Sequence, residues 1–405
     1  MSIEKVFNQM NRFNVVALFS FLSIVACSEE ETTLTESFFK IYDDSDFDLA
    51  YDPIDVVETT NGFIILTGTE ISSSDFDGIQ LIKVDQEGNF LRESEITDYV
   101  APAGDIYLNS ADSNVYFFAM NPTTFASTLI GINTNLEVQS EVTLSSLNYP
   151  LSVSPLVDGT LLLLSYDNLN AETEISNIGI DGSFLGGNSY SIGPGEDLEA
   201  EVIDHFLESS DRPLPFFCGE YSSGNYYFNG FYNYSFSTVF TDFGNTPTGV
   251  LQGQDANAGL RSALSLGNGN FAVSGYQFDD NYQLASVDLN TSGTTSSVDL
   301  YPGNMAEIKP YTTAKIVSYT SSSETYTVFA SETKGNQIVL HFYNSTSGAI
   351  DGVQFVGFLN PFAFSSIKVT SDNSLLILGT TFVAGRFERI MLNKISQSEI
   401  DDIVN

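Results

Sequence analysis

The chain has 405 residues, with 14 Lys and Arg against 52 Asp and Glu, and its formal net charge at pH 7 is -38. Nucleic acids are excluded as partners by this charge, because binding to them needs cationic side chains that neutralise phosphates. Cofactor-binding and catalytic motifs are not visible, so the sequence predicts no cofactor and assigns no catalytic residue.

The first predicted element is an export signal over residues 1–26. Lys5 and Arg12 supply a positive start, Phe13–Val25 form a short apolar core, and a small alanine precedes Cys27. The core is shorter than the ~20 residues that span a bilayer, which makes a transmembrane helix the weaker interpretation. We expect Cys27 to carry lipid and to begin the mature protein. The alternative is an ordinary secretory peptide with an incidental cysteine.

The remainder divides into a linker at residues 27–36 and one domain at residues 37–405. The mature part has a net charge of -39, because the signal removes two cations and one anion. Cys218 is the other cysteine and would have no disulfide partner if Cys27 is acylated. It lies in an apolar run, Pro215–Gly219, which predicts a buried and unreactive thiol.

Beyond the linker, short aliphatic and aromatic runs alternate with Gly, Asn, Asp and Ser turns, as strands and tight turns do. The clearest unit has a strand, turn and strand over Asp55–Gly68, then an acidic turn at Asp75–Gly78. Two more strands follow at Ile79–Asp85 and Phe90–Ile96. The unit therefore predicts four antiparallel strands.

The unit recurs, and a small residue closes the second strand of each copy. These residues are Gly68, Ala119, Ser165, Gly219, Gly275, Ala330 and Gly379. Their mean spacing is about 52 residues, close to the period of propeller repeats. Four-stranded sheets bury both faces by packing radially, and small residues fit where neighbouring sheets crowd. The sequence predicts an all-β fold, a seven-bladed β-propeller of four-stranded antiparallel blades.

The last copy stops after its third strand, near Phe387–Ile395. The run Ser37–Tyr42, ahead of the first copy, is the candidate for the fourth strand, and this N-terminal strand would close the ring. Closure removes exposed sheet edges. The competing interpretation is that Glu399–Val404 complete the blade themselves.

The first unit, from Asn61 through Asp85 to Asn89, resembles the repeat of bacterial secreted β-propellers. That repeat is common in lipoproteins of the Bacteroidota. Acidic residues directly after a lipidated cysteine resemble the signal that this group uses for export to the outer face of the outer membrane. Ser28–Glu31 matches that signal. The resemblance implies a cell-surface lipoprotein and is nearly silent about function, because propellers host unrelated activities.

Acidic clusters are plentiful, and we predict no metal site. Asp44–Asp48 and Ser73–Gly78 have the alternating oxygens of calcium loops, but neither has a Glu at the twelfth loop position. His205 lies among carboxylates in Glu199–His205, which we interpret as solvated residues at a strand edge. Paired carboxylates for glycoside hydrolysis stay open, because their separation is a property of the folded chain.

The strongest candidate surface is the aromatic stretch Tyr221–Phe243. Tyrosine suits recognition surfaces because it joins rigid apolar area to a polar tip, and its rings also stack on sugars. Asn229-Gly230 predicts a two-residue hairpin turn there. Alternate aromatics of such a hairpin would instead pack between blades. The candidate binding residues are Tyr226, Tyr227, Phe231, Tyr232 and Tyr234.

The preferred interpretation is a lipid-anchored binding or scaffolding module at the outer membrane, exposed on the cell surface, with a protein partner. One alternative is an accessory glycan-binding lipoprotein in nutrient capture. A second is a hydrolase with an unrecognised carboxylate site. We expect membrane association through the lipid and no nucleic-acid partner.

Overall fold

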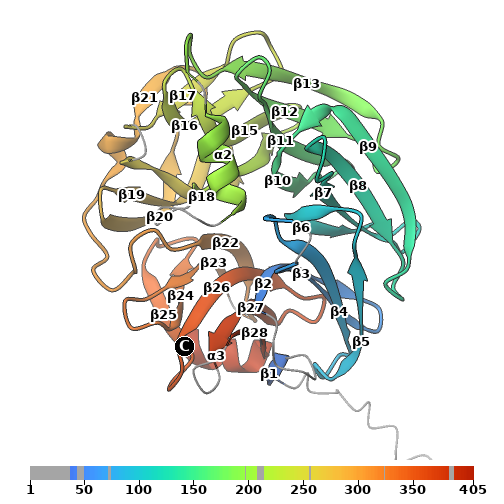
Figure 1. Cartoon of the computed structure of the whole chain (residues 1–405). Coiled ribbons are helices and arrows are strands. Elements are labelled where there is room, and N and C mark those ends of the chain that lie inside the picture. Colours follow the sequence, from blue (N-terminus) through green and yellow to red (C-terminus); the bar gives the residue numbers. More distant parts are fainter. Residues whose placement is uncertain are drawn as a thin grey trace, which may run out of the picture. The chain divides into compact units, whose positions relative to one another are not determined.

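The computed structural model describes residues 37–42, 50–71, 74–196, 198–207, 214–254, 257–322, 324–382 and 387–405. Their strands form seven sheets, which Figure 1 shows as blades around a common centre. The fold is a seven-bladed β-propeller, as the repeat predicts. The acidic stretch Asp44–Asp48 lies outside the described residues.

Each blade has an innermost, a second, a third and usually an outermost strand, in chain order except in blade 7, whose outermost strand comes from the N-terminal part of the chain. The innermost strands, from blade 1 to blade 7, are β2 (Tyr51–Thr59), β6 (Val100–Leu108), β10 (Pro150–Pro155), β14 (Phe217–Ser222), β18 (Ala258–Gly267), β22 (Ala314–Thr320) and β26 (Phe362–Val369). The second strands are β3 (Gly62–Thr69), β7 (Val115–Met120), β11 (Leu161–Asp167), β15 (Asn225–Tyr232), β19 (Asn270–Gln277), β23 (Thr325–Glu332) and β27 (Leu375–Phe382). Each innermost strand contacts the innermost strands of both neighbouring blades, so the contacts run around a closed ring.

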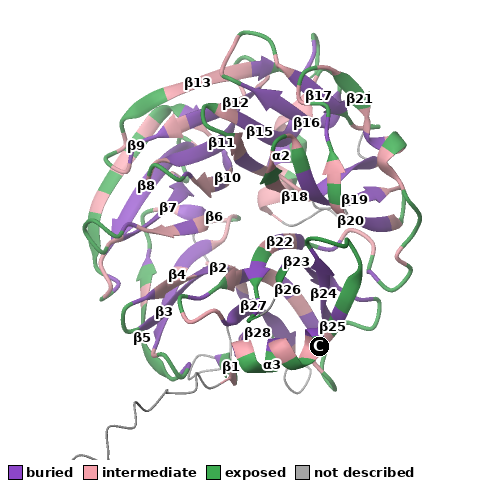
Figure 2. Cartoon of the chain, turned by 180° about the vertical axis from the view of Figure 1, so that it is seen from behind, coloured by how far each residue is buried: buried purple, intermediate pink, exposed green. Residues whose placement is uncertain are grey.

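The third strands are β4 (Gly78–Val84), β8 (Ala126–Ile132), β12 (Glu172–Ile178), β16 (Ser235–Thr241), β20 (Asp280–Asp288), β24 (Ile338–Asn344) and β28 (Glu388–Ile395). The outermost strands are β5 (Phe90–Ile96), β9 (Val138–Asn148), β13 (Phe184–Ser191), β17 (Gly249–Gln252), β25 (Ile350–Val356) and, in blade 7, β1 (Phe38–Tyr42). Figure 2 shows middle strands that are largely buried and outer strands that are largely exposed. The reason is radial packing, which covers both faces of a middle strand and therefore favours continuous apolar runs there.

The ring closes through its N-terminal strand. β1 pairs antiparallel with β28, from Phe38 opposite Lys394 to Tyr42 opposite Ile390, which confirms the shared blade. The competing interpretation is wrong, because the terminal residues form helix α3 (Gln397–Val404) instead of a strand. Ser396 caps this helix by accepting a hydrogen bond from the Glu399 amide at 3.4 Å. A serine three residues ahead of a glutamate is the sequence signature of such a cap.

Blades 4 and 5 depart from the four-stranded pattern. The short strand β21 (Thr294–Ser296) follows blade 5 in the chain but pairs in parallel with β17, and a 3₁₀ turn, η1 (Ser297–Leu300), comes next. Blade 4 therefore has five strands and blade 5 has three among the described residues. The fourth repeat also needs a correction, since Gly219 lies on β14 and Gly230 occupies the second strand.

The predicted Asn229-Gly230 hairpin is wrong. Both residues lie inside β15, and the turn comes at Asn233 and Tyr234, whose φ angles of 47° and 69° suit a two-residue hairpin loop. Asn229 is buried, and its Nδ2 donates to the carbonyl oxygen of Leu260 in blade 5 at 3.0 Å. A tertiary hydrogen bond therefore replaces the local turn that the dipeptide favours.

The segment Glu199–His205 is helical, not a strand edge. It forms helix α2 (Glu199–Phe206) in the connection between β13 and β14, with Glu201 and Asp204 exposed and Val202 buried. The His205 ring packs against Phe216, with ring centroids 4.8 Å apart. In the described part of the chain, no helix is both long enough and apolar enough to cross a membrane.

Candidate functional site

The five aromatic residues singled out from the sequence do not share one surface. Tyr226 and Tyr227 are buried, Phe231 and Tyr232 are half-buried, and Tyr234 is 53% exposed. Tyr227 meets a ring of blade 5, since it lies edge-on to Phe271 with centroids 5.4 Å apart. Tyr226 and Tyr227 are consecutive on β15 and point to opposite faces of blade 4, Tyr226 toward blade 3 and Tyr227 toward blade 5, so both rings pack between blades. A binding role for the set stays a prediction.

The buried position predicted for Cys218 is confirmed. Its Sγ donates to the carbonyl oxygen of Leu162 in blade 3 at 3.5 Å, and burial raises the pKa of the thiol to about 12. A thiol needs a lowered pKa to act as a nucleophile near neutral pH. Cys218 therefore serves packing between blades 3 and 4.

A network of four charged side chains joins the innermost strands of four blades. Asp55 of blade 1 is fully buried, and its Oδ2 lies 2.9 Å from Lys368 Nζ of blade 7. Asp105 of blade 2 receives both lysines, with Oδ1 at 3.2 Å from Lys368 Nζ and 2.9 Å from Lys315 Nζ of blade 6. The network therefore ties together the blades on either side of the ring closure.

The electrostatics of this network hold the Asp105 carboxyl as an anion. Burial alone would raise the pKa of Asp105, but the ammonium groups of Lys315 and Lys368 hold it well below its ordinary value. Burial alone would lower the pKa of Lys368, but the same contacts raise it. Asp105 makes the larger contribution and Asp55 the smaller one. A general acid must hold a proton near neutral pH. Asp105 is therefore not the proton donor that glycoside hydrolysis needs.

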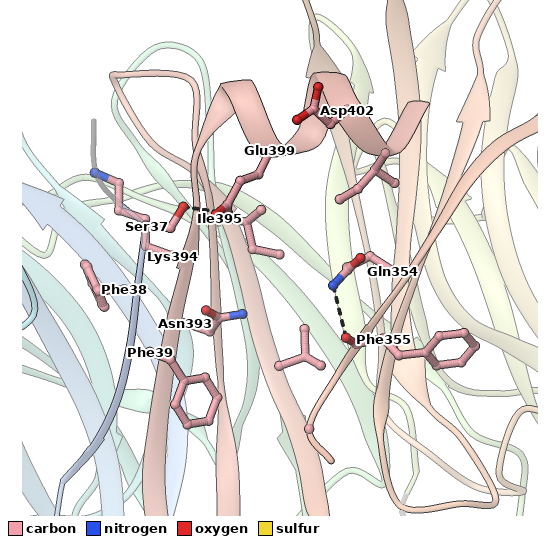
Figure 3. Close-up of a pocket in the computed structure, with 13 residues that line it drawn as sticks. Ser37, Phe38, Phe39, Gln354, Phe355, Asn393, Lys394, Ile395, Glu399 and Asp402 are labelled. Carbon is pink, nitrogen blue, oxygen red and sulfur yellow. Dashed lines mark hydrogen bonds between the residues drawn. The ribbon is translucent and has the colours of Figure 1, made fainter. Parts of the chain in front are cut away.

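The strongest candidate for binding is a groove of about 570 Å³ on the outer rim, between blades 6 and 7. We call it the rim groove. Figure 3 shows β25 on one side, β1 and β28 on the other, and α3 across one end. Its lining residues are Ser37, Phe38, Phe39, Gln354, Phe355, Val356, Gly357, Asn393, Lys394, Ile395, Glu399, Asp402 and Ile403.

The end of the rim groove beside α3 is polar and acidic. Ser37 Oγ donates to Glu399 Oε2 at 2.6 Å and accepts a hydrogen bond from the Ser396 amide at 2.9 Å. These two bonds fix the start of β1 against the start of α3. The one lysine of the lining, Lys394, is buried and lies 2.6 Å from Asp372. Its charge is therefore already neutralised, and Glu399 and Asp402 set the charge of this end.

The other end of the rim groove is apolar and exposed. Phe39 and Phe355 are each 45% exposed, on the outermost strands of two neighbouring blades. Phe39 also packs edge-on against Phe362, with centroids 5.9 Å apart, which holds its ring in place. Phe358 and Leu359 come directly after the groove lining in the chain and are 87% and 85% exposed. Exposed apolar residues that gather in one place mark interaction surfaces, unlike single scattered ones.

Both the rim groove and the charged network escape sequence reasoning, for different reasons. The groove joins Ser37 to Glu399, which are 362 positions apart in the chain. The network had one usable signal, the lysines inside the apolar strands Ala314–Thr320 and Phe362–Val369 of a lysine-poor chain. Asp75–Asp77 of the acidic turn lie between β3 and β4, and Gly78 begins β4, as the repeat predicts. In the described residues, no three metal-ligating side chains cluster.

Comparison with family models gives no match, and no curated protein matches the chain. Among solved structures, the chain is similar to a catalytically inactive virginiamycin B lyase from Staphylococcus aureus with Quinupristin. The identity is 11%, the TM-score is 0.50, and the match covers 89% of this chain and 100% of that one. The β-propeller domain of the Trilobed protease from Pyrococcus furiosus matches at 10% identity and a TM-score of 0.48, over 88% and 98% of the two chains. A streptogramin B lyase matches at 13% identity and 0.47, over 90% and 99%. These likenesses concern the propeller fold alone.

Proposed function

We propose that the protein is a lipid-anchored β-propeller of the outer membrane that binds a protein partner at the rim groove. The observation that carries the proposal is the half-exposed ring of Phe39, which lies on the β1 wall of the groove. Phe355 is equally exposed on the β25 wall, and Figure 3 shows its ring turned to the outer side of that strand. A partner side chain placed in the groove would bury apolar area of Phe39, and a partner that also covers β25 would bury Phe355. Aromatic residues around a pocket are typical of the energetic centre of an interface.

The charge of the rim groove defines the partner further. Glu399 and Asp402 face its polar end, and Lys394 is already paired, so the groove attracts cations. A complementary segment presents an apolar side chain to the rings and a lysine or arginine to the carboxylates. Charge complementarity of this kind speeds association and suppresses wrong partners.

The position of the groove suits a membrane-anchored protein. Ser37 lines the groove, and it lies ten positions after Cys27, the expected site of acylation. Ten extended residues reach at most about 35 Å. A lipid at Cys27 would therefore keep this rim near the membrane, within reach of outer-membrane proteins.

A site-specific photo-cross-linking experiment on intact cells tests the proposal. A photoreactive amino acid replaces Phe355 in one strain and Phe278 in a second, because Phe278 is 57% exposed on a different blade. We expect one dominant protein adduct from position 355, lost when Phe39→Asp is added, and no such adduct from position 278. Equal adducts from both positions would contradict the rim groove as the binding site. Release of the protein from membranes by Cys27→Ser, together with surface proteolysis, tests the anchor and its exposure separately.

A glycan is the second candidate ligand for the same groove. Gln354 and Asn393 place amide groups in the groove, where Phe39 supplies a phenyl ring, and amides with an aromatic ring also suit a sugar. A glycan array distinguishes the two candidates. Binding to a defined glycan that is lost on Phe39→Ala would favour the sugar, whereas a silent array with the cross-link intact would favour the protein partner.

A further inference from the structure

Arg261 of β18 is a buried cation for which the described residues supply no counter-ion. The residue is only 6% exposed. Nε donates one long hydrogen bond to Asn281 Oδ1 at 3.3 Å. The guanidinium carbon lies 4.5 Å from the centroid of Tyr276 and 5.5 Å from that of Tyr311. Among the described residues, no carboxylate lies within ion-pair distance of Arg261.

Within the described part of the chain, this arrangement leaves the buried guanidinium without a carboxylate partner. Moving an ion out of water costs several kcal/mol, and the cation–π contacts contribute only about 0.5–2 kcal/mol in return. Burial lowers the pKa of Arg261 to about 10, so the guanidinium stays protonated at neutral pH. The chain has 52 acidic residues and pairs other cations with them, as it does Lys368 and Lys394. The missing partner at Arg261 is therefore a specific feature of this site.

The groups around Arg261 are held in place. Asn281 Nδ2 donates to the carbonyl oxygen of Lys309 at 3.2 Å, which leaves Oδ1 directed at the guanidinium. The Tyr311 hydroxyl donates to Asp279, and Tyr311 has a φ of 58°, an unusual backbone conformation for a bulky residue. Conformations of this kind cluster at ligand sites and persist only where their surroundings enforce them. Asn281 and Tyr311 are therefore fixed around the guanidinium.

Gln283 adds a second unsatisfied group on the same face of blade 5. It lies two residues after Asn281 on β20, so both side chains point to one side of the strand. Gln283 is buried, and neither Nε2 nor Oε1 has a hydrogen-bond partner in the described part of the chain. A buried amide without partners costs free energy unless something outside the chain satisfies it. Arg261 and Gln283 together offer an excess of donors.

We infer that Arg261, supported by Gln283 and Asn281, forms a binding site for a small oxyanion group. A carboxylate or a phosphate supplies both the negative charge and the paired acceptors that the guanidinium fork recognises. Its oxygens also accept from the Gln283 amide. The site lies on blade 5, apart from the rim groove of blades 6 and 7, and does not depend on the function proposed above.

Thermal unfolding of the full chain in detergent, followed by circular dichroism, tests this site. Sodium acetate, sodium phosphate and sodium chloride are titrated separately at a constant total ionic strength. We expect a saturable rise in Tm of a few degrees in the acetate or the phosphate series, and the series that responds identifies the oxyanion. Equal Tm values in all three series would overturn the proposal.

Three variants locate the response. Arg261→Lys keeps the charge but loses the fork, and we expect at least about tenfold weaker half-saturation. Arg92→Gln, an exposed arginine of β5, should respond like the parent chain. Asn281→Asp places a carboxylate within reach of the Arg261 Nε and should abolish the rise in Tm. Because Arg261 itself is retained, this variant tests the site even if Arg261→Lys fails to fold. An unchanged response in Asn281→Asp and Arg261→Lys would also overturn the assignment.

Discussion

Replacement of Asp55 by asparagine tests whether the charged network at the ring centre holds the propeller closed. The carboxylate is fully buried and accepts from the Ile106 amide at 3.0 Å, from the Ser366 hydroxyl at 2.5 Å and from Lys368 Nζ at 2.9 Å. Asparagine keeps the shape but removes the charge and turns one acceptor into a donor. Removal of one partner from a buried ion pair costs about 3–5 kcal/mol when the other charge is left buried and unpaired. Lys368 keeps Asp105 as a partner at 3.2 Å, so we expect a loss at the lower end of that range, about 3 kcal/mol, for Asp55→Asn.

Urea unfolding followed by circular dichroism measures this loss, and Asp105→Asn is the matched control. Asp105 belongs to the same network, but its side chain is 32% exposed, so water replaces part of what the substitution removes. We expect Asp105→Asn to cost clearly less, about 1–2 kcal/mol. A loss below about 1 kcal/mol for Asp55→Asn, or equal losses for the two variants, would refute the reasoning. The slope of the unfolding free energy against urea should not change.

Three further predictions concern pH, thiol reactivity and blade packing. Burial lowers the pKa of His205 to about 4, so near pH 6.5 the unfolded chain takes up a proton that the folded chain does not. The free energy of unfolding should therefore fall by up to about 3 kcal/mol between pH 6.5 and pH 4. His205→Asn should flatten the curve of Tm against pH. Cys218 should resist a thiol reagent until urea is added, because it is buried. In urea, one thiol per chain reacts in total if Cys27 is acylated, and two react if it is not. Gly379→Ala should lower the free energy of unfolding in urea by about 3 kcal/mol, because the new methyl carbon would lie 2.1 Å from a backbone oxygen of β26. Gly335→Ala is the control and should be close to neutral, because the nearest atom to its new methyl carbon is 3.5 Å away.

The blade architecture can be predicted from the sequence because each repeat encodes its strands locally. In the first unit, the predicted runs Ile79–Asp85 and Phe90–Ile96 match β4 and β5 to within one residue. Glycines mark the turns, and a small residue marks the crowded point of the second strand. The N-terminal strand was predictable for a different reason, since a ring with one strand missing has an exposed edge unless the other terminus supplies it.

Blades 4 and 5 were harder to predict because tertiary contacts override local signals there. Asn229-Gly230 has the strongest short-range hairpin signal in the segment, yet the Asn229 amide donates to a carbonyl of blade 5. The connection that contains α2 lengthens the fourth repeat, which moved the predicted small residue from Gly230 to Gly219. A repeat located by its average spacing places an insertion of this kind in the wrong strand.

The rim groove lay beyond sequence reasoning because its two walls come from distant parts of the chain. One wall is β1, the strand that also closes the ring, and the other is β25 of the preceding blade. The groove therefore exists only while β1 is paired with β28. A ligand that contacts both walls binds the closed ring and not the open one, so it stabilises closure by an amount set by its concentration relative to its Kd. Binding at the rim and integrity of the propeller are consequently coupled. A partner of the groove should raise the Tm of the chain, and a variant that weakens the β1 pairing should weaken binding even where Phe39 and Phe355 are intact.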